Sequence, residues 1–192
     1  MTPIVLASSS KYRRQILEKL GLDFISCGSD VDESRKPGEL PEVMVSRLSI
    51  EKAAALGKLY PEHLIIGSDQ AAVLDQEILG KPGGREVAIQ QLVKQSGRTV
   101  QFYTGICVLD SKTGRCLSDR DVCSVHFKTL ASSQICNYVD LDQPFDCAGS
   151  FKSEGLGIAL FSKIVGDDPN ALVGLPLIKL VSLLEKFGVK IL

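Results

Sequence analysis

The sequence predicts an α/β protein built on one mixed β-sheet with flanking helices. Apolar runs of strand length alternate along the 192 residues with segments of helical spacing. Two long strand-like segments are joined by the short turn "SKTG" at 111–114. A tight hairpin is antiparallel, whereas alternation of strands with helices favours parallel pairs, so both kinds of pairing are expected in one sheet.

The N-terminal segment predicts a strand followed by a helix. Residues 4–7 form a short apolar run, Ser10 is a good N-cap, and Gly21 can end the helix. A helix N-terminus presents unpaired N–H groups and a partial positive charge, so the serines and arginines here suit a phosphate. The alternative is an ordinary N-cap followed by a solvated basic turn.

The middle of the chain predicts a helix and two strands. Segment 34–41 is loop-like, and Pro41 starts a helix. One face of that helix is expected to hold Met44, Leu48, Ala55 and Leu59. Residues 63–75 predict a buried strand, a polar break and a second strand, and a helix follows at about 85–95.

The remaining elements are the hairpin and two further helices. Strands are predicted at 99–110 and 120–130, on either side of the turn. Helices are predicted at 132–140 and 175–188. The last helix has an apolar face formed by Leu177, Leu180, Val181 and Leu184.

Composition excludes several classes of partner. The formal net charge is −1, which gives no electrostatic case for a nucleic-acid or membrane-surface partner. No apolar run approaches the ~18 residues of a transmembrane helix, and no secretion signal is evident. Six cysteines without a CxxC pair, and only two histidines, argue against a zinc site. The cysteines are therefore expected to be reduced core thiols of a cytoplasmic protein.

Polar residues interrupt the apolar pattern in several short segments. The candidates are Ser8 in the serine-rich turn, Glu33 in "DVDES", Lys52 in "IEKAA", Asp69 and Gln70 in "GSDQ", Lys81 in "GKP" and Glu154 in "GSFKSEGLG". Carboxylates beside basic loops suit a divalent cation and a polyphosphate. Taken singly, Asp69 could be a turn former or cap, Glu33 and Glu154 solvated acids, and the two lysines exposed surface residues.

Together, these pieces resemble the Maf family of nucleoside triphosphate pyrophosphatases over essentially the whole chain. The matching pieces are "LASSSKYRRQIL", "DVDE", "EKA", "IIGSDQ", "GKP", "FYTG", "CAGSFKSEGLG" and "DPNALVGLPL". Within the family, "IIGSDQ" and "CAGSFKSEG" are most similar to the YceF-type subgroup, which is associated with hydrolysis of 7-methyl-GTP. The resemblance implies a single Maf-like domain over 1–192, with an elongated, two-lobed, ITPase-like architecture and a central cleft. It also implies a homodimer and a divalent metal cation, Mg²⁺, Mn²⁺ or Co²⁺.

The resemblance also implies roles for individual residues. Asp69 matches the proposed proton acceptor and, with Glu33, the acids near the metal. The phosphate side is matched by Ser8, Ser10, Arg13, Lys52 and Lys81. Positions tied to substrate choice are matched by Tyr12, Gln70 and Glu154. The subgroup pattern Ser-Pro-Trp-Arg is replaced here by Ser-Lys-Tyr-Arg at 10–13, which keeps the cap and an aromatic face.

The sequence thus predicts a pyrophosphatase that hydrolyses 7-methyl-GTP to 7-methyl-GMP and pyrophosphate and so removes a modified nucleotide. In the expected mechanism, Asp69 orients or deprotonates a water that attacks the α-phosphorus. One alternative is a pyrophosphatase for dTTP, UTP or another modified nucleotide. The alternative from another class is a regulator of septum formation that acts through protein partners.

Overall fold

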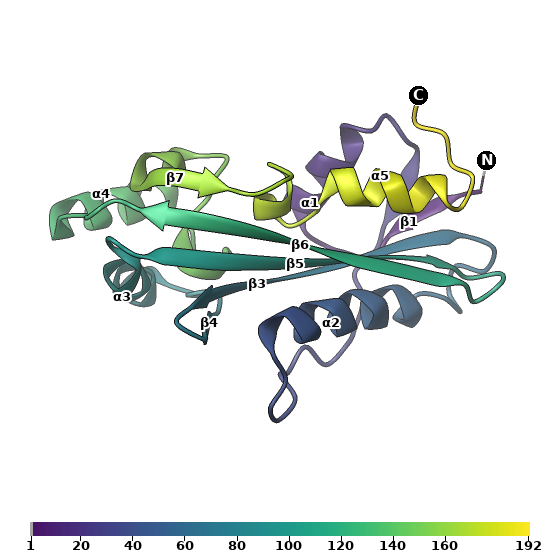
Figure 1. The fold of residues 1–192 in the computed structure, drawn as a ribbon, viewed down its shortest axis with the longest axis horizontal. Helices are drawn as coiled ribbons and strands as arrows, with labels where there is room; N and C mark the ends of the chain where they lie inside the picture. The colour runs from purple at the N-terminus through teal and green to yellow at the C-terminus, as the bar shows by residue number, and fades with distance from the viewer. Residues whose placement is uncertain (1) are drawn as a thin grey trace. The chain divides into compact units, whose positions relative to one another are not determined.

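The computed structural model describes residues 2–192, which contain a seven-stranded sheet and five α-helices (Figure 1). The strands are β1 (Ile4–Leu6), β2 (Phe24–Ser26), β3 (Leu64–Leu74), β4 (Glu77–Leu79), β5 (Thr99–Asp110), β6 (Cys116–Phe127) and β7 (Phe161–Val165). The helices are α1 (Lys11–Glu18), α2 (Pro41–Ala55), α3 (Arg85–Gln95), α4 (Ser132–Asp142) and α5 (Leu177–Glu185).

The sheet is mixed, as the sequence predicts. Its strand order is β2-β1-β3-β5-β6-β7, with β4 paired to β3 outside this path. Strand β1 runs parallel to β2 and β3, whereas β4 is antiparallel to β3 and β7 is antiparallel to β6. None of the helices in the described part of the chain is both long and apolar enough to span a membrane.

The chain divides into two compact units, which are described separately. Unit 1 contains Met1–Gln70, Thr104–Asp121 and Asp168–Leu192, and unit 2 contains Ala71–Tyr103 and Val122–Asp167. Strands β3, β5 and β6 each contribute residues to both units. The central cleft and the single 1–192 domain implied by the resemblance stay predictions.

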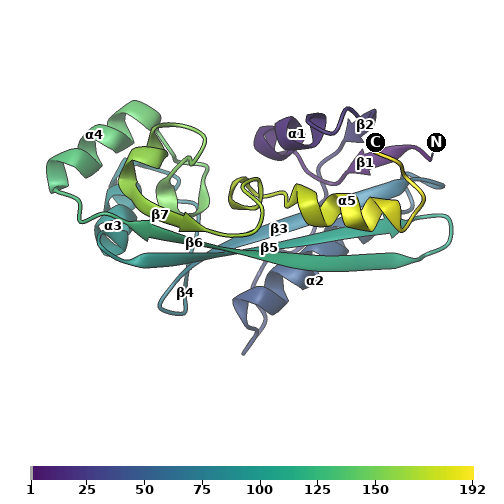
Figure 2. The same ribbon diagram turned by 45° about the horizontal axis from the view of Figure 1, so that its top comes forward.

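In unit 1, helices cover both faces of the sheet (Figures 1 and 2). Strand β1 shows how alternation divides the core, because Ile4 and Leu6 pack with α1 and α5 while Val5 and Ala7 pack with α2. Residues Leu180 and Leu184 of α5 lie in the first of these clusters, and Ala53 of α2 lies in the second. Side chains on the two faces of β1 therefore position three helices, α1 and α5 on one face and α2 on the other.

Two glycines let α2 approach the sheet closely. A Cβ atom at Gly67 of β3 would overlap the carbonyl oxygen of Ser49, and one at Gly105 of β5 would overlap that of Val45. The helix backbone thus lies directly on these strands, where a larger residue would push it away. This close packing places the C-terminal half of α2 against the middle of β3.

Unit 2 has its own apolar core and polar contacts. Edge-to-face pairs join Phe151 to Phe102, Phe127 and Phe161, with ring centroids 4.7–5.6 Å apart. The buried Gln95 of α3 donates from Nε2 to the carbonyl oxygen of Gly149 at 2.9 Å. Helices α3 and α4 are also in contact. Packing around α3 therefore holds the glycine-rich segment that contains Glu154.

Most predicted elements are confirmed. Ser10 caps α1 by accepting from the backbone N–H of Arg13, and Pro41 occupies the first turn of α2. The structure confirms the 85–95 helix, the 99–110 strand and the helices near 132–140 and 175–188. The hairpin is also confirmed, but its second strand spans Cys116–Phe127 instead of the predicted 120–130. Among the short strands, β1 was predicted from its continuous apolar run, whereas β2, β4 and β7 include polar residues and were not predicted.

The predicted polar break at 63–75 is wrong, because β3 is one continuous strand of 11 residues. The hydroxyl of Ser68 donates to the carbonyl oxygens of Gly105 and Gly174, both at 2.9 Å. The carboxylate of Asp69 is paired with Lys52. Polar side chains that find partners inside the fold do not interrupt a buried strand.

Two further predictions are corrected. Ala55 and Leu59 were predicted to lie on the buried face of α2, but both are exposed. The helix ends at Ala55, and its buried side continues through Ala53 to Leu56. The expectation that all six cysteines are core thiols is wrong. Cys107 and Cys123 are buried, whereas Cys116 is exposed.

Candidate active site

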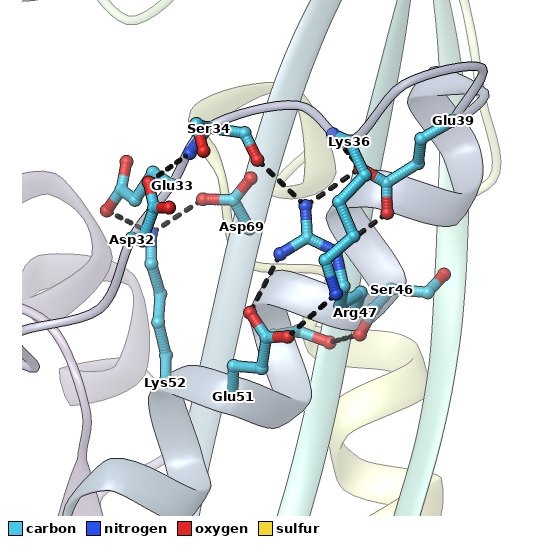
Figure 3. Close-up of polar contacts among 11 residues, drawn as sticks. Asp32, Glu33, Ser34, Lys36, Glu39, Ser46, Arg47, Glu51, Lys52 and Asp69 are labelled. Atoms are coloured by element: carbon cyan, nitrogen blue, oxygen red, sulfur yellow. Dashed lines mark hydrogen bonds and ion pairs between the residues drawn. The ribbon is translucent and has the colours of Figure 1, made fainter.

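Two carboxylates meet at the ammonium group of Lys52 (Figure 3). The Nζ atom lies 2.6 Å from Asp69 Oδ1 and 2.7 Å from Glu33 Oε1. Lys52 is only 6% exposed and Asp69 7%, whereas the side chain of Glu33 is 60% exposed. The surface-lysine alternative for Lys52 is therefore wrong, and so is the turn or cap alternative for Asp69, which lies within β3.

The position of this ion pair follows from packing. Lys52 lies on the buried stripe of α2, which rests on β3 at Gly67. Asp69 is two residues farther along the same strand and points to the same face, because side chains alternate. Buried aspartate and lysine side chains are uncommon unless they are paired, as these two are. This pair is therefore the first candidate for the catalytic centre.

Arg13 extends the cluster from the N-terminal turn of α1. Its Nη1 donates to the carbonyl oxygen of Ser68 and its Nε to that of Gly174, both at 2.9 Å. Burial lowers the pKa of Arg13, and the negative charges of Asp69 and Glu33 oppose that shift. A guanidinium stays protonated in proteins, so Arg13 is a fixed positive charge beside Asp69.

The serine-rich turn is held by its own side chains. The backbone N–H of Ser10 donates to Ser8 Oγ at 3.1 Å, and the N–H of Arg13 donates to Ser10 Oγ at 3.4 Å. Ser26 Oγ donates to the carbonyl oxygen of Ser8 at 2.8 Å. The N-cap predicted at Ser10 is thus confirmed. The solvated-turn alternative is wrong at Arg13, which is half-buried, and a phosphate role for these serines stays a prediction.

Gln70 faces the segment that precedes α5. Its Nε2 lies 3.0 Å from Thr104 Oγ1, 2.8 Å from the carbonyl oxygen of Ala171 and 3.1 Å from that of Leu172. The side-chain nitrogen of Gln70 is therefore already hydrogen-bonded to acceptors within unit 1. If Gln70 contacts the base or holds Glu154, as expected, it must do so through its side-chain oxygen.

Sequence reasoning missed three residues that hold this region together. They are Ser68, Thr104 and Asp168. The carboxylate of Asp168 is 1% exposed and accepts from the backbone N–H groups of Asn170 and Ile178, both at 2.7 Å. The Asp-Pro-Asn sequence at 168–170 was the available signal, since aspartate commonly bonds the backbone two residues on.

Three further predicted residues are described within their own units. Lys81 and Glu154 belong to unit 2, where both are exposed. Ser153 Oγ donates to Glu154 Oε2 at 3.4 Å. Tyr12, in α1, is half-buried, and the Lys11 ammonium lies 4.9 Å from its ring centroid. Within unit 1, the structure thus brings together Arg13, Glu33, Lys52 and Asp69.

The donor set at Lys52 fits a divalent cation. Oxygens of Glu33 and Asp69 already converge on one positive centre, the lysine ammonium. Mg²⁺ commonly binds proteins through one or two carboxylates and takes its other ligands from water and substrate phosphates. Across 2–192 there is no group of three or more His, Cys, Asp or Glu suited to a metal.

Comparison with known proteins identifies the family. Residues 3–187 match the family described as Maf-like protein. The chain belongs to the Maf family. Relatives named 7-methyl-GTP pyrophosphatase include one from Colwellia psychrerythraea, 52% identical over 100% of this chain and 96% of its own length. Those from Alcanivorax borkumensis (54%, 98% and 95%) and Pseudomonas aeruginosa (52%, 100% and 100%) are similar. The buried Lys52–Asp69 pair is thus part of a Maf fold.

Proposed function

We propose that this protein is a nucleoside triphosphate pyrophosphatase that hydrolyses 7-methyl-GTP to 7-methyl-GMP and pyrophosphate. The observation that carries the proposal is the buried Lys52–Asp69 pair with Glu33 beside it, in a chain whose full-length relatives bear that activity in their names. A buried lysine–carboxylate pair next to a fixed arginine charge suits hydrolysis of a phosphoric anhydride.

Asp69 is the general base that activates the water molecule. Its carboxylate accepts a proton from a water molecule as the water oxygen attacks the α-phosphorus. The bond between the α-phosphorus and its bridging oxygen then breaks, and pyrophosphate leaves. Lys52 holds the carboxylate of Asp69 in place by an ion pair, and with Arg13 it places positive charge near the phosphates.

A divalent cation would complete the proposed site. Glu33 and Asp69 are the residues that would hold it, and the ion would neutralise phosphate charge and act as a Lewis acid. Phosphoryl transfer requires little covalent help from a protein, so positioning and electrostatic stabilisation account for most of the rate. We expect a cytoplasmic homodimer whose partner is a small nucleotide rather than a nucleic acid or a membrane.

A panel of triphosphates tests the proposal. Release of pyrophosphate from 7-methyl-GTP, GTP, dTTP, UTP and ATP would be measured with and without Mg²⁺ or Mn²⁺. The highest kcat/KM is expected for 7-methyl-GTP, and only with metal. A preference for dTTP or UTP would favour the alternative substrate class, and no release from any triphosphate would overturn the enzymatic function.

Glu154 and Tyr12 are expected to select the base. The 7-methylguanine ring is positively charged and stacks well on an aromatic face, and its N1–H and amine form a paired donor edge for a carboxylate. The Glu154→Gln variant should therefore lose more activity on 7-methyl-GTP than on UTP, and Tyr12→Ala should behave likewise.

Tyr12→Trp is the matched control for stacking and should be tolerated. All variants would be compared by kcat/KM on both substrates. If each variant loses the same factor on 7-methyl-GTP and on UTP, neither residue chooses the base, and Glu154 is the solvated acid of the simpler alternative.

A further inference from the structure

Arg47 joins the loop that carries Glu33 to helix α2 (Figure 3). Its Nε and Nη2 donate to the two carboxylate oxygens of Glu39 at 2.7 and 2.8 Å, and Nη1 donates to Glu51 Oε2 at 2.8 Å. Nη2 also donates to the carbonyl oxygen of Ser34 at 3.1 Å. One guanidinium thus holds both ends of the 34–39 segment.

The two acidic partners of Arg47 differ in how deeply they are buried. The side chains of Arg47 and Glu39 are only 15% and 7% exposed, whereas that of Glu51 is 38% exposed. The hydrogen bonds from Arg47 lower the pKa of Glu39 to about 2, so the pair stays ionised at any pH suited to an assay. Glu39 also accepts from the backbone N–H of Lys36, which folds the loop onto the pair.

We propose that Arg47 is a positioning residue for the pyrophosphatase reaction, acting by holding Glu33 against Lys52. Glu33 directly precedes Ser34, whose carbonyl oxygen Arg47 binds, and its own side chain is mostly exposed. Lys52 lies on the same helix as Arg47, five residues farther on. The inference rests on the proposed function, because it assigns Glu33 a part in that reaction.

Arg47→Lys tests this role, because lysine keeps the charge but lacks the two-pronged geometry that binds Glu39 and Ser34 together. The variant should lower kcat for 7-methyl-GTP by at least about tenfold, since displacing a group by ~1 Å can cost ~10²-fold. Arg85→Lys is the matched control, because Arg85 makes a similar bidentate pair with Asp140 in unit 2, at 2.6 and 2.9 Å. It should leave kcat unchanged.

A double-mutant cycle separates positioning from general stability. In a Glu33→Gln background, Arg47→Lys should have little further effect on kcat, because the group that it positions has lost its charge. Melting temperature would be recorded for every variant. An undiminished effect in the Glu33→Gln background, or wild-type kcat for Arg47→Lys, would overturn the positioning role. Failure of the wild-type protein to hydrolyse any triphosphate would instead count against the proposed function.

A second, independent observation concerns two cysteines in the β5–β6 hairpin. The Sγ atoms of Cys107 and Cys116 lie 3.1 Å apart, about 1 Å longer than the ~2.05 Å of a disulfide bond. Cys107 is buried beside α2, whereas Cys116 is exposed at the start of β6. Burial raises the pKa of Cys107, which leaves Cys116 as the thiol that meets an oxidant in solvent.

We infer that Cys107 and Cys116 form a reversible modification site that a peroxide closes to a disulfide. The Cys116 thiolate attacks hydrogen peroxide, takes one oxygen to become a sulfenic acid and releases hydroxide. The Cys107 sulfur then attacks the Cys116 sulfur, and the hydroxyl group leaves with the Cys107 proton as water. The two electrons lost by the thiols have passed to the peroxide, and an added thiol restores both groups.

Peptide mass spectrometry of the full chain tests this site. After treatment with hydrogen peroxide and alkylation, we expect a Cys107–Cys116 crosslink that dithiothreitol reverses, together with a raised melting temperature. Cys116→Ser should abolish both changes, whereas Cys136→Ser, the control at a half-buried thiol, should abolish neither. Oxidation of Cys136 without any 107–116 crosslink, or Cys116 pairing only between chains, would overturn the inference.

Discussion

Asp69→Asn is expected to lower turnover of 7-methyl-GTP by about 10²–10⁴-fold, the range for loss of one general base. Asparagine has the same shape and can still accept a hydrogen bond from Lys52, now 2.6 Å from Asp69 Oδ1, so the continuous strand β3 should persist. It cannot take a proton from water. The measurement is kcat on the best substrate of the panel, with circular dichroism to check folding.

Asp69→Asn also distinguishes the enzymatic function from the alternative binding function. A regulator of septum formation that acts through partners should keep its function when the carboxylate becomes an amide, because its surface is unchanged. Turnover within threefold of the parent would remove Asp69 from the mechanism. The metal and base roles of Asp69 would then both need another residue.

Lys52→Ala should have the second large effect, and it should act on both activity and stability. Loss of one donor to the developing phosphate charge commonly lowers kcat by about 10²–10³-fold. Asp69 would also become a buried charge without its partner, and breaking a buried pair costs about 3–5 kcal/mol of unfolding free energy. Pyrophosphate release and urea denaturation measure the two effects separately.

Lys94→Ala is the stability control for the Lys52 variant, and Lys81→Ala tests the second proposed phosphate contact. Lys94 forms an exposed ion pair with Glu77, so Lys94→Ala should change the unfolding free energy by less than about 1 kcal/mol. Lys81→Ala, at an exposed position, should lower kcat/KM without loss of stability, and raised ionic strength should partly mimic it. If the Lys52 and Lys81 variants both keep wild-type kcat/KM, the phosphate assignments are wrong.

Local sequence chemistry determined where most elements begin and what kind of sheet they form. Ser10 predicted the start of α1 and Pro41 that of α2, because caps and first-turn prolines act on backbone groups within one turn. The hairpin turn at 111–114 predicted antiparallel pairing within an α/β sheet. The resemblance to Maf proteins, which depends on motifs rather than on contacts, predicted the family.

Only the tertiary structure decided which polar residues are buried and what they bind. No local pattern distinguishes Lys52 from an exposed helix lysine. Its burial depends on α2 resting on Gly67 and Gly105, which brings it to Asp69 from 17 residues away. The role of Arg47 and the continuity of β3 through Ser68 were equally hidden. Caps and periodicity act between neighbours in the chain, whereas the partner of a buried polar group depends on how distant elements pack.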